Sequence, residues 1–439
     1  MAAPLMVSFT LRFLFVFVDL AYAAVLDDDN AAVAAIGFYA PLQSIHIALW
    51  VGLSAGFTAS LSRAFGHRDE VRVAQLKRSM LTLLTMVIPL LMLVGAGVYL
   101  LVPHLGLEPR LSEAFLIYAS TVAIGGPIIG FWSIYPDSIV KAHQDTRSTM
   151  IAGLASAFTN VALNTLFVFG FGWGIFGIAL ATVISRIAGL WYAMHRAGIL
   201  EAGRRAAGWG SSEQVWPAPM STMLMLALPG ALTHLLMAVE GGVINKVLTG
   251  LPHSTAAIAS YAVYQQLLML AMMPAAGASV AVVPYVARAM ATGEAARIRR
   301  ELAGTVRLVL AIALGVTICS GWVFAEPISG FFVDRQSLGD STSMTMNAMR
   351  LLPLAALATA PFYILRPIFE ATHKPRMGIE ISIARFVVLS VPLILAGRHL
   401  APAVGLDGLS GVILGIVTAT GLASSLAAYR AREALRTTP

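Results

Sequence analysis

Residues 15–38, "FVFVDLAYAAVLDDDNAAVAAIGF", carry a single acid, Asp19, inside a long apolar run that ends at "DDDN". A helix that crosses a bilayer needs about 20 mostly apolar residues, and the run from residue 4 to 26 meets that length. Asp19 lies about 8 residues, or roughly 12 Å, from the outer end of this run, which is too far for a short carboxylate to reach water. We therefore expect a membrane span in which Asp19 faces a water-filled cavity, has a polar partner or carries a proton.

The composition extends this expectation to the whole chain. Of the 439 residues, 58% are hydrophobic and only 12% are charged, and the mean hydropathy is +0.80. A soluble globular protein carries about 25% charged residues, so most of this chain must lie in a bilayer. Its one cysteine, Cys319, excludes an internal disulfide. The sequence predicts an all-α integral membrane protein.

Twelve apolar runs are long enough to span the membrane. They cover residues 4–26, 33–61, 79–102, 114–136, 149–169, 174–195, 222–248, 256–287, 303–324, 346–369, 378–397 and 404–428. Nineteen of the 29 Lys and Arg residues lie in one alternating set of loops and the C-terminal tail, and three lie in the other set. Because cytoplasmic loops are rich in Lys and Arg, both termini are predicted to be cytoplasmic. This distribution explains the net charge of +7 without nucleic acid.

The two halves of the chain resemble each other. Four pairs of segments match in order: 31–43 with 255–267, 61–70 with 286–295, 139–147 with 368–376, and 174–181 with 405–412. Since each half holds six spans, both halves enter the membrane in the same direction, as in transporters built from parallel repeats. We predict an N-lobe at 1–195, a cytoplasmic linker at 196–220 and a C-lobe at 221–439.

Catalytic and nucleotide-binding motifs are absent from the sequence or fall in the wrong context. "GLSAG" at 52–56 matches the G-x-S-x-G of hydrolases, but it lies inside an apolar helix with no preceding strand. We interpret Gly52 and Gly56 instead as a surface where two helices approach closely. No phosphate-binding loop, H-E-x-x-H motif or paired cysteine site occurs in the sequence. The sequence therefore does not predict an enzyme or an ATP-driven pump.

Polar residues inside the spans are costly there and mark candidate functional positions. Asn160 and Asn164 are four residues apart, so their amides share one helix face. Arg12 lies two turns from Asp19 and is a candidate partner for it. The other polar residues of the spans are His46, Thr182, His234, Glu240, Asn245, Lys246, Arg350, Arg366, Glu370 and Arg385.

Taken together, these features resemble the multidrug and toxic compound extrusion (MATE) transporters over nearly the whole chain. The resemblance rests on Asp19 followed by "AAVAAIGFYAPL", on "GLSAGFTASLSRAFG", "AHQDTR" and "NVALNTLFVFGFGWGIFGIALAT", and on the duplication. It implies twelve helices in two six-helix lobes that form a V around a central cavity. It also implies export of organic cations and drugs, driven by Na⁺ or H⁺, with no other cofactor.

The resemblance further implies a cation site in the N-lobe made by Asp19, Asn160, Asn164 and Thr182. Relatives of this type have an acid at the position of Asn164, so this chain keeps a single carboxylate. Na⁺ held by Asp19 and Asn160 and H⁺ carried by Asp19 both remain open. Glu240 is a second candidate, for drug or cation contact, with Asn245, Arg366 and Arg385 near it in the C-lobe.

We therefore expect a monomeric antiporter of small organic cations or toxic metabolites in a plasma membrane, the inner membrane of a bacterium. The alternative is a flippase of the same superfamily for a lipid-linked or amphipathic substrate, which Arg350, Arg366 and Arg385 keep open.

Overall fold

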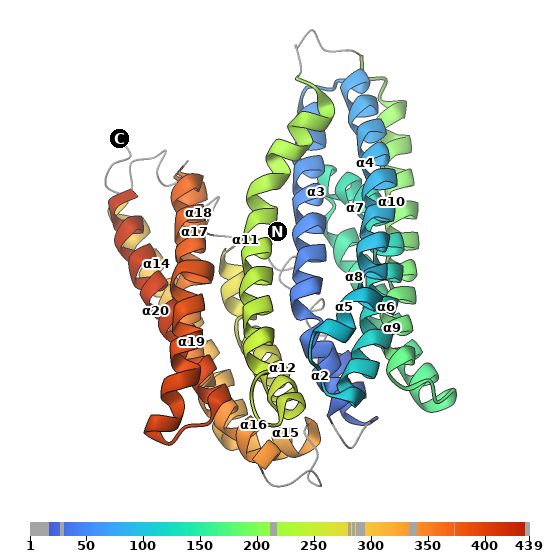
Figure 1. Cartoon of the computed structure of the whole chain (residues 1–439). Coiled ribbons are helices and arrows are strands. Elements are labelled where there is room, and N and C mark those ends of the chain that lie inside the picture. Colours follow the sequence, from blue (N-terminus) through green and yellow to red (C-terminus); the bar gives the residue numbers. More distant parts are fainter. Residues whose placement is uncertain are drawn as a thin grey trace.

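The structure, a computed structural model, describes residues 17–26, 30–210, 217–279, 282, 286, 295–332, 340–372 and 374–434 (Figure 1). Throughout these ranges the regular elements are helices. The candidate partner Arg12 lies outside the described residues, and so does the side chain of Glu370.

The N-lobe contains the helical residues 17–24 and nine labelled helices. These are α2 (Ala31–Phe38), α3 (Ala40–Gly66), α4 (Glu70–Ala96), α5 (Val98–Leu101), α6 (Pro109–Trp132), α7 (Ile134–Ala142), α8 (Thr146–Thr165), α9 (Gly174–Ile184) and α10 (Arg186–Ala206). A short 3₁₀ helix, η1 (Val102–His104), follows α5, and a π-helical segment, η2 (Leu166–Gly170), continues α8. Because α10 continues to Ala206, it extends into the predicted linker.

The C-lobe begins with α11 (Pro219–Leu248). Its other helices are α12 (Ser254–Ala271), α14 (Ala295–Ile318), α15 (Ala325–Phe332), α16 (Asp340–Arg350), α17 (Leu352–Ala371), α18 (Pro375–Ile383), α19 (Ser390–Leu400) and α20 (Gly408–Ala434). The π-helical segments η3 (Cys319–Val323) and η4 (Ala384–Leu389) and the 3₁₀ helix η5 (Ala401–Val404) connect them.

The predicted spans agree with the helices of the described part of the chain. Ten of these helices are long and apolar enough to cross a membrane, and the bent pair Ser254–Ala271 and Met273–Ser279, at 47°, adds an eleventh. They coincide with the second to twelfth predicted spans. The first, 4–26, lies mostly outside the described residues. The all-α membrane architecture is confirmed.

The repeat is visible in the backbone as well as in the sequence. Asn30 and His253, with φ of 60° and 53°, are left-handed residues that precede α2 and α12. They start the second span of each half, at the positions where segments 31–43 and 255–267 match. A left-handed conformation is uncommon outside glycine, so its recurrence at matched positions supports the duplication.

The two lobes meet along α3 and α11, which run side by side through the centre of Figure 1. A Cβ atom on Gly52 would lie 2.8 Å from the Ala227 carbonyl oxygen of α11, and one on Gly56 would collide with the Met223 carbonyl oxygen. The prediction that these glycines form a close helix–helix surface is confirmed. The absence of a side chain is what lets the two backbones approach.

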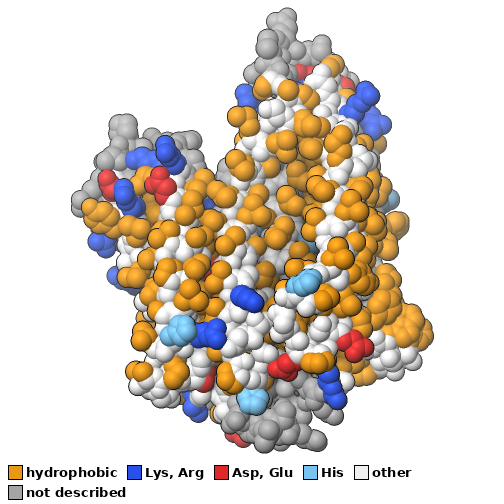
Figure 2. All heavy atoms as spheres, in the orientation of Figure 1, with side chains coloured by type: hydrophobic (Ala, Val, Ile, Leu, Met, Phe, Trp, Pro, Cys, Tyr) orange, Lys and Arg blue, Asp and Glu red, His pale blue; other side chains and the backbone are white. Residues whose placement is uncertain are grey.

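Apolar side chains cover most of the face of the molecule in Figure 2, and Lys and Arg lie mainly toward its ends. Many large apolar side chains are more than half exposed, among them Leu93, Leu100, Phe158, Trp191 and Met225. A surface of this extent is typical of contact with lipid. The same view shows a notch at the upper end, between α11 and the C-lobe helices α17 and α18.

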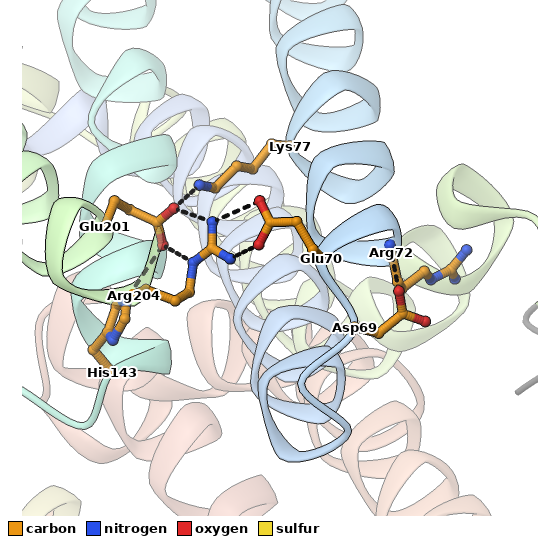
Figure 3. A network of polar contacts seen from close by, with 7 residues as sticks. All are labelled: Asp69, Glu70, Arg72, Lys77, His143, Glu201 and Arg204. Carbon is orange, nitrogen blue, oxygen red and sulfur yellow. Dashed lines mark hydrogen bonds and ion pairs between the residues drawn. The ribbon is translucent and has the colours of Figure 1, made fainter. Parts of the chain in front are cut away.

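A polar network ties three N-lobe helices together at that end (Figure 3). Arg204 of α10 donates from Nη2 to Glu201, at 2.8 Å, and also pairs with Glu70 of α4. Glu201 in turn pairs with Lys77 and lies 3.1 Å from His143 Nε2, directly after α7. Removing one member of such a buried network leaves uncompensated charge, so the network holds these helices together at this end.

Candidate functional site

The four predicted N-lobe site residues lie together, and Asp19 is at the centre. Its Oδ1 accepts hydrogen bonds from Asn164 Nδ2 at 2.8 Å and Asn160 Nδ2 at 3.3 Å, and its Oδ2 accepts one from Thr182 Oγ1 at 2.7 Å. Asp19 is 2% exposed, and both asparagines are fully buried. Three converging donors stabilise a carboxylate where water does not solvate it.

Local helix geometry explains this convergence. Asn160 and Asn164 occupy successive turns of α8 and so face the same neighbour. Tyr22, nearly one turn beyond Asp19, approaches Thr165 Oγ1 at 2.6 Å with its hydroxyl. The helix of residues 17–24 therefore contacts α8 through polar side chains at two successive turns, those of Asp19 and Tyr22. A change in the charge of Asp19 acts directly on that contact.

The asparagine amides also determine what the site can bind. Asn160 Oδ1 already accepts from Asn164 Nδ2 at 3.2 Å. Asn164 Oδ1 is buried and has no hydrogen-bond partner among the described residues. A buried acceptor without a partner is costly, and a proton on Asp19 or a bound cation would satisfy it.

Arg186, the first residue of α10, is a nearby charge that the sequence interpretation missed. Its guanidinium interacts electrostatically with Asp19 and with the buried Tyr39 and Tyr118. It follows Thr182 by four residues, and a basic residue within an apolar run was the available signal. Only the fold shows that it lies beside the Asp19 site.

The C-lobe holds a second buried acid with different partners. Glu240 of α11 pairs through Oε1 with Arg385 Nη1 and accepts a hydrogen bond from Ser390. Glu240 and Arg385 are each 7% exposed. Arg385 lies in the π-helical η4, and such segments frequently occur at functional positions.

The two other predicted C-lobe residues have separate surroundings. Asn245 Nδ2 donates to the Phe38 carbonyl oxygen at 2.8 Å, a contact between the lobes. Arg366 donates to Thr233 at 2.8 Å and Ser382 at 3.2 Å. Of the two arginines predicted as partners for Glu240, the structure pairs Arg385 with it, whereas Arg366 bonds Thr233 and Ser382. Glu240 and Asn245 also line a small pocket with Pro41, Ser44, Tyr261 and Gln265, between the lobes.

Another acid joins the lobes at the end opposite the notch. Glu108, just before α6, accepts hydrogen bonds from Ser254 Oγ at 2.9 Å and Thr255 Oγ1 at 2.6 Å, at the start of α12. It also accepts from the Thr255 backbone N–H at 3.4 Å. Burial alone would raise the Glu108 pKa, but the hydrogen bonds from Thr255 and Ser254 outweigh it and hold the pKa below its usual value. An N-lobe carboxylate thus caps a C-lobe helix.

Comparison with known proteins decides the family. The MatE family model matches residues 4–166 and 229–395, which is most of the chain. The chain belongs to the MatE family. MatE proteins are transporters and not enzymes, so this chain is a multi-pass membrane transporter.

Known MatE relatives match nearly end to end at low identity. A FAD transporter of Shewanella oneidensis is 23% identical over 91% of this chain and 86% of its own length. The multidrug export protein MepA of Staphylococcus saprophyticus is also 23% identical, over 99% of this chain and 93% of its own length. A solved multidrug resistance MATE family transporter in an inward-facing conformation has a TM-score of 0.83 at 19% identity, covering 98% of this chain and 96% of that one. At that identity the structural match shows the fold alone.

Proposed function

We propose that this transporter is a secondary active antiporter that exports organic cations, drugs or toxic metabolites in exchange for H⁺. The observation that carries the proposal is Asp19, a buried acid held by two amides and a hydroxyl within the membrane. Neutralising Asp19 weakens these charge-assisted hydrogen bonds and lets the helix of residues 17–24 repack. Alternating access then links loading of the ion to release of the substrate.

The donor set favours H⁺ over Na⁺ as the coupling ion. Na⁺ needs several oxygen acceptors, whereas the groups that reach Asp19 here act as donors. Asn160 Oδ1 is already engaged, which leaves Asn164 Oδ1 as the acceptor without a partner. A single proton on Asp19 can donate to one such oxygen after a small side-chain rotation. Na⁺ coordination by Asp19 and Asn160 would require the side-chain amides to rotate, so that oxygen and not nitrogen faces the ion.

The contacts between the lobes support an inward-facing state. Glu108 and Asn245 join the lobes at the predicted outer end. The notch in Figure 2 lies at the opposite end, where the basic linker predicts the cytoplasm. With both termini cytoplasmic, this notch is the path by which a substrate would enter from the cell, in a bacterial inner membrane. The inward-facing relative supports the same assignment.

The names of the relatives support small amphipathic organic molecules as substrates. One relative is named for multidrug export and another for FAD transport. We assign the same broad class here, small molecules that combine an aromatic or apolar body with a charged group. We propose that the protein acts as a monomer, since each chain carries both lobes and both acids.

Proteoliposomes test this proposal. The purified protein is reconstituted, ethidium is supplied as a fluorescent organic cation, and pH and Na⁺ gradients are imposed separately. We expect ethidium movement to follow the pH gradient and to be absent from protein-free liposomes. Movement that follows only the Na⁺ gradient would contradict H⁺ coupling. Movement with neither gradient would contradict cation export.

A flippase for a lipid-linked or amphipathic substrate is the second candidate. It is favoured by Arg186, whose exposed guanidinium would suit an anionic head group within the membrane. Fluorescent phospholipid in the same proteoliposomes tests it. Gradient-independent exchange between leaflets, with no ethidium movement, would replace the antiporter proposal with the flippase.

A further inference from the structure

The strongest unexplained feature of the N-lobe is the position of Arg186. It lies 12 residues after Gly174, the start of the span, which is about 18 Å along the helix and near the middle of a bilayer of about 30 Å. It also follows Thr182, a direct partner of Asp19, by one turn toward the predicted cytoplasmic end. A charge at this depth is costly and is usually functional.

In the described part of the chain, Arg186 has none of the partners that would fix a structural arginine. Its side chain is exposed, and within the described ranges no hydrogen bond or ion pair holds it. A Cβ atom on Gly130 would lie 2.9 Å from Arg186 Nη1, so the guanidinium rests on α6 at a residue with no side chain. Among the described residues, the donors of the guanidinium are therefore not used by another group.

Four groups from neighbouring elements interact electrostatically with Arg186. They are Asp19 on the first helix, Tyr39 between α2 and α3, His46 on α3 and Tyr118 on α6. Asp19 is the one carboxylate among them. No ion pair within 4.0 Å joins Asp19 to Arg186 in the described part, so the guanidinium acts on the carboxylate from a distance.

The interaction between the Arg186 guanidinium and a cation bound at Asp19 is repulsive. A proton or a Na⁺ ion at Asp19 adds one positive charge close to a fixed positive charge. The guanidinium therefore opposes binding of either ion and favours the empty, ionised carboxylate. Its effect does not depend on which ion couples transport.

We propose that Arg186 is a positioning residue that opposes retention of the coupling ion at Asp19. This inference rests on the proposed ion-coupled function. Without the guanidinium, the ion binds Asp19 more tightly and leaves more slowly. A coupled transporter needs an ion site that is both filled and emptied in each cycle. Arg186 favours the release of the ion.

The test compares Arg186→Gln, Arg186→Lys and a control, Arg147→Gln, at an exposed position of α8. Proton-driven ethidium transport is measured in proteoliposomes over a range of pH. We expect Arg186→Gln to reach half-saturation at roughly tenfold lower proton concentration and to turn over more slowly. Arg186→Lys keeps the charge and should stay close to the wild type, as should Arg147→Gln.

Infrared difference spectroscopy provides a readout that does not depend on transport. The carboxyl band of protonated Asp19, identified by its loss in Asp19→Asn, is titrated in wild type and Arg186→Gln. We expect the band to persist to higher pH in Arg186→Gln. An unchanged titration would overturn the inference, even if transport is lost, because the arginine would then act on substrate or structure. If wild-type protein moves no ethidium with either gradient, the proposed function fails, while the titration still decides the role of Arg186.

Discussion

Asp19 and Glu240 occupy matching places in the two lobes but have opposite kinds of partner. Each lies on the first helix of its half, and each is bonded to the fifth span of that half. Asp19 is held by the amides of Asn160 and Asn164, with Thr182 added from the sixth span. Glu240 is held by the guanidinium of Arg385 and by Ser390.

The difference separates an acid in contact with a cation from an acid in contact with dipoles. Glu240 and Arg385 compensate each other directly, so removing either member would leave a buried, unpaired charge. Among the described residues, Asp19 has dipoles in contact, and its nearby cation, Arg186, is not paired with it. We infer that the duplicated architecture assigns ion exchange to the N-lobe and a structural ion pair to the C-lobe.

The largest expected effect is the loss of coupled transport in Asp19→Asn. An amide at position 19 keeps the shape of the site but cannot be ionised, so the two states of the cycle no longer differ in charge. Gradient-driven ethidium transport should fall to the level of empty liposomes. Glu113→Gln, at an exposed position of α6, is the matched control and should transport normally. Normal transport by Asp19→Asn would show that the coupling charge lies elsewhere.

Breaking the C-lobe pair should affect stability more than it affects ion coupling. Arg385→Gln or Glu240→Gln alone leaves a buried charge without its partner, which costs about 3–5 kcal/mol of unfolding free energy. The double variant should recover much of this loss. Thermal unfolding in detergent measures all three, with Asp19→Asn for comparison. A loss as large in Asp19→Asn as in Arg385→Gln would remove the distinction between the two acids.

Asn164→Asp tests the comparison between the two acids by changing a partner of Asp19 in the N-lobe. The variant places a second carboxylate beside Asp19, where this chain has an amide. Two adjacent carboxylates repel each other unless a cation joins them, so the variant should gain affinity for Na⁺. We expect Na⁺, but not K⁺, to raise its Tm by about 2 °C or more and to leave the wild type unchanged. A wild type stabilised equally by Na⁺ would contradict H⁺ coupling.

Much of the N-lobe site could be predicted from the sequence because its signals are local. Asn160 and Asn164 share a face through helix spacing alone, and Asp19 is conspicuous inside an apolar run. Thr182 was visible as a polar residue in a span, but its place in the site came through the family resemblance, since a threonine in a span carries little signal. Arg186 was missed because its importance depends on a neighbouring helix that sequence spacing does not place.

The C-lobe was harder to predict for a physical reason. Arg366 and Arg385 were equivalent candidates to partner Glu240, since both lie in apolar runs. Arg385 is in a π-helical segment, where side chains leave the 3.6-residue period on which sequence patterns depend. The contacts that join the lobes, such as Asn245 to Phe38, link distant segments and leave no periodic signal. The fold class, in contrast, follows from hydropathy and charge, and both extend along the whole chain.

The smallest expected effect concerns a third acid, Glu108. It tests whether charge also controls the contact between the lobes at their outer end. Glu108→Ala removes the cap that the N-lobe provides for α12, which is worth about 1 kcal/mol, and Glu108→Gln should remove part of it. The outer ends of the lobes should therefore separate more often. Pulsed electron resonance between spin labels at Tyr99→Cys and Val404→Cys, with Cys319→Ser, measures their separation.

The pH dependence of that separation identifies the charge. Because the Glu108 pKa lies below the usual value of 4.5, its contribution is present above about pH 4.5 and is lost as the pH falls through the depressed pKa. The wild type should therefore approach Glu108→Gln only under acid conditions, while Glu108→Gln itself changes little over that range. Near neutral pH the cap remains ionised, so a proton gradient would act on Asp19 and leave this contact closed. An equal acid response in Glu108→Gln would mean that another group controls the outer end.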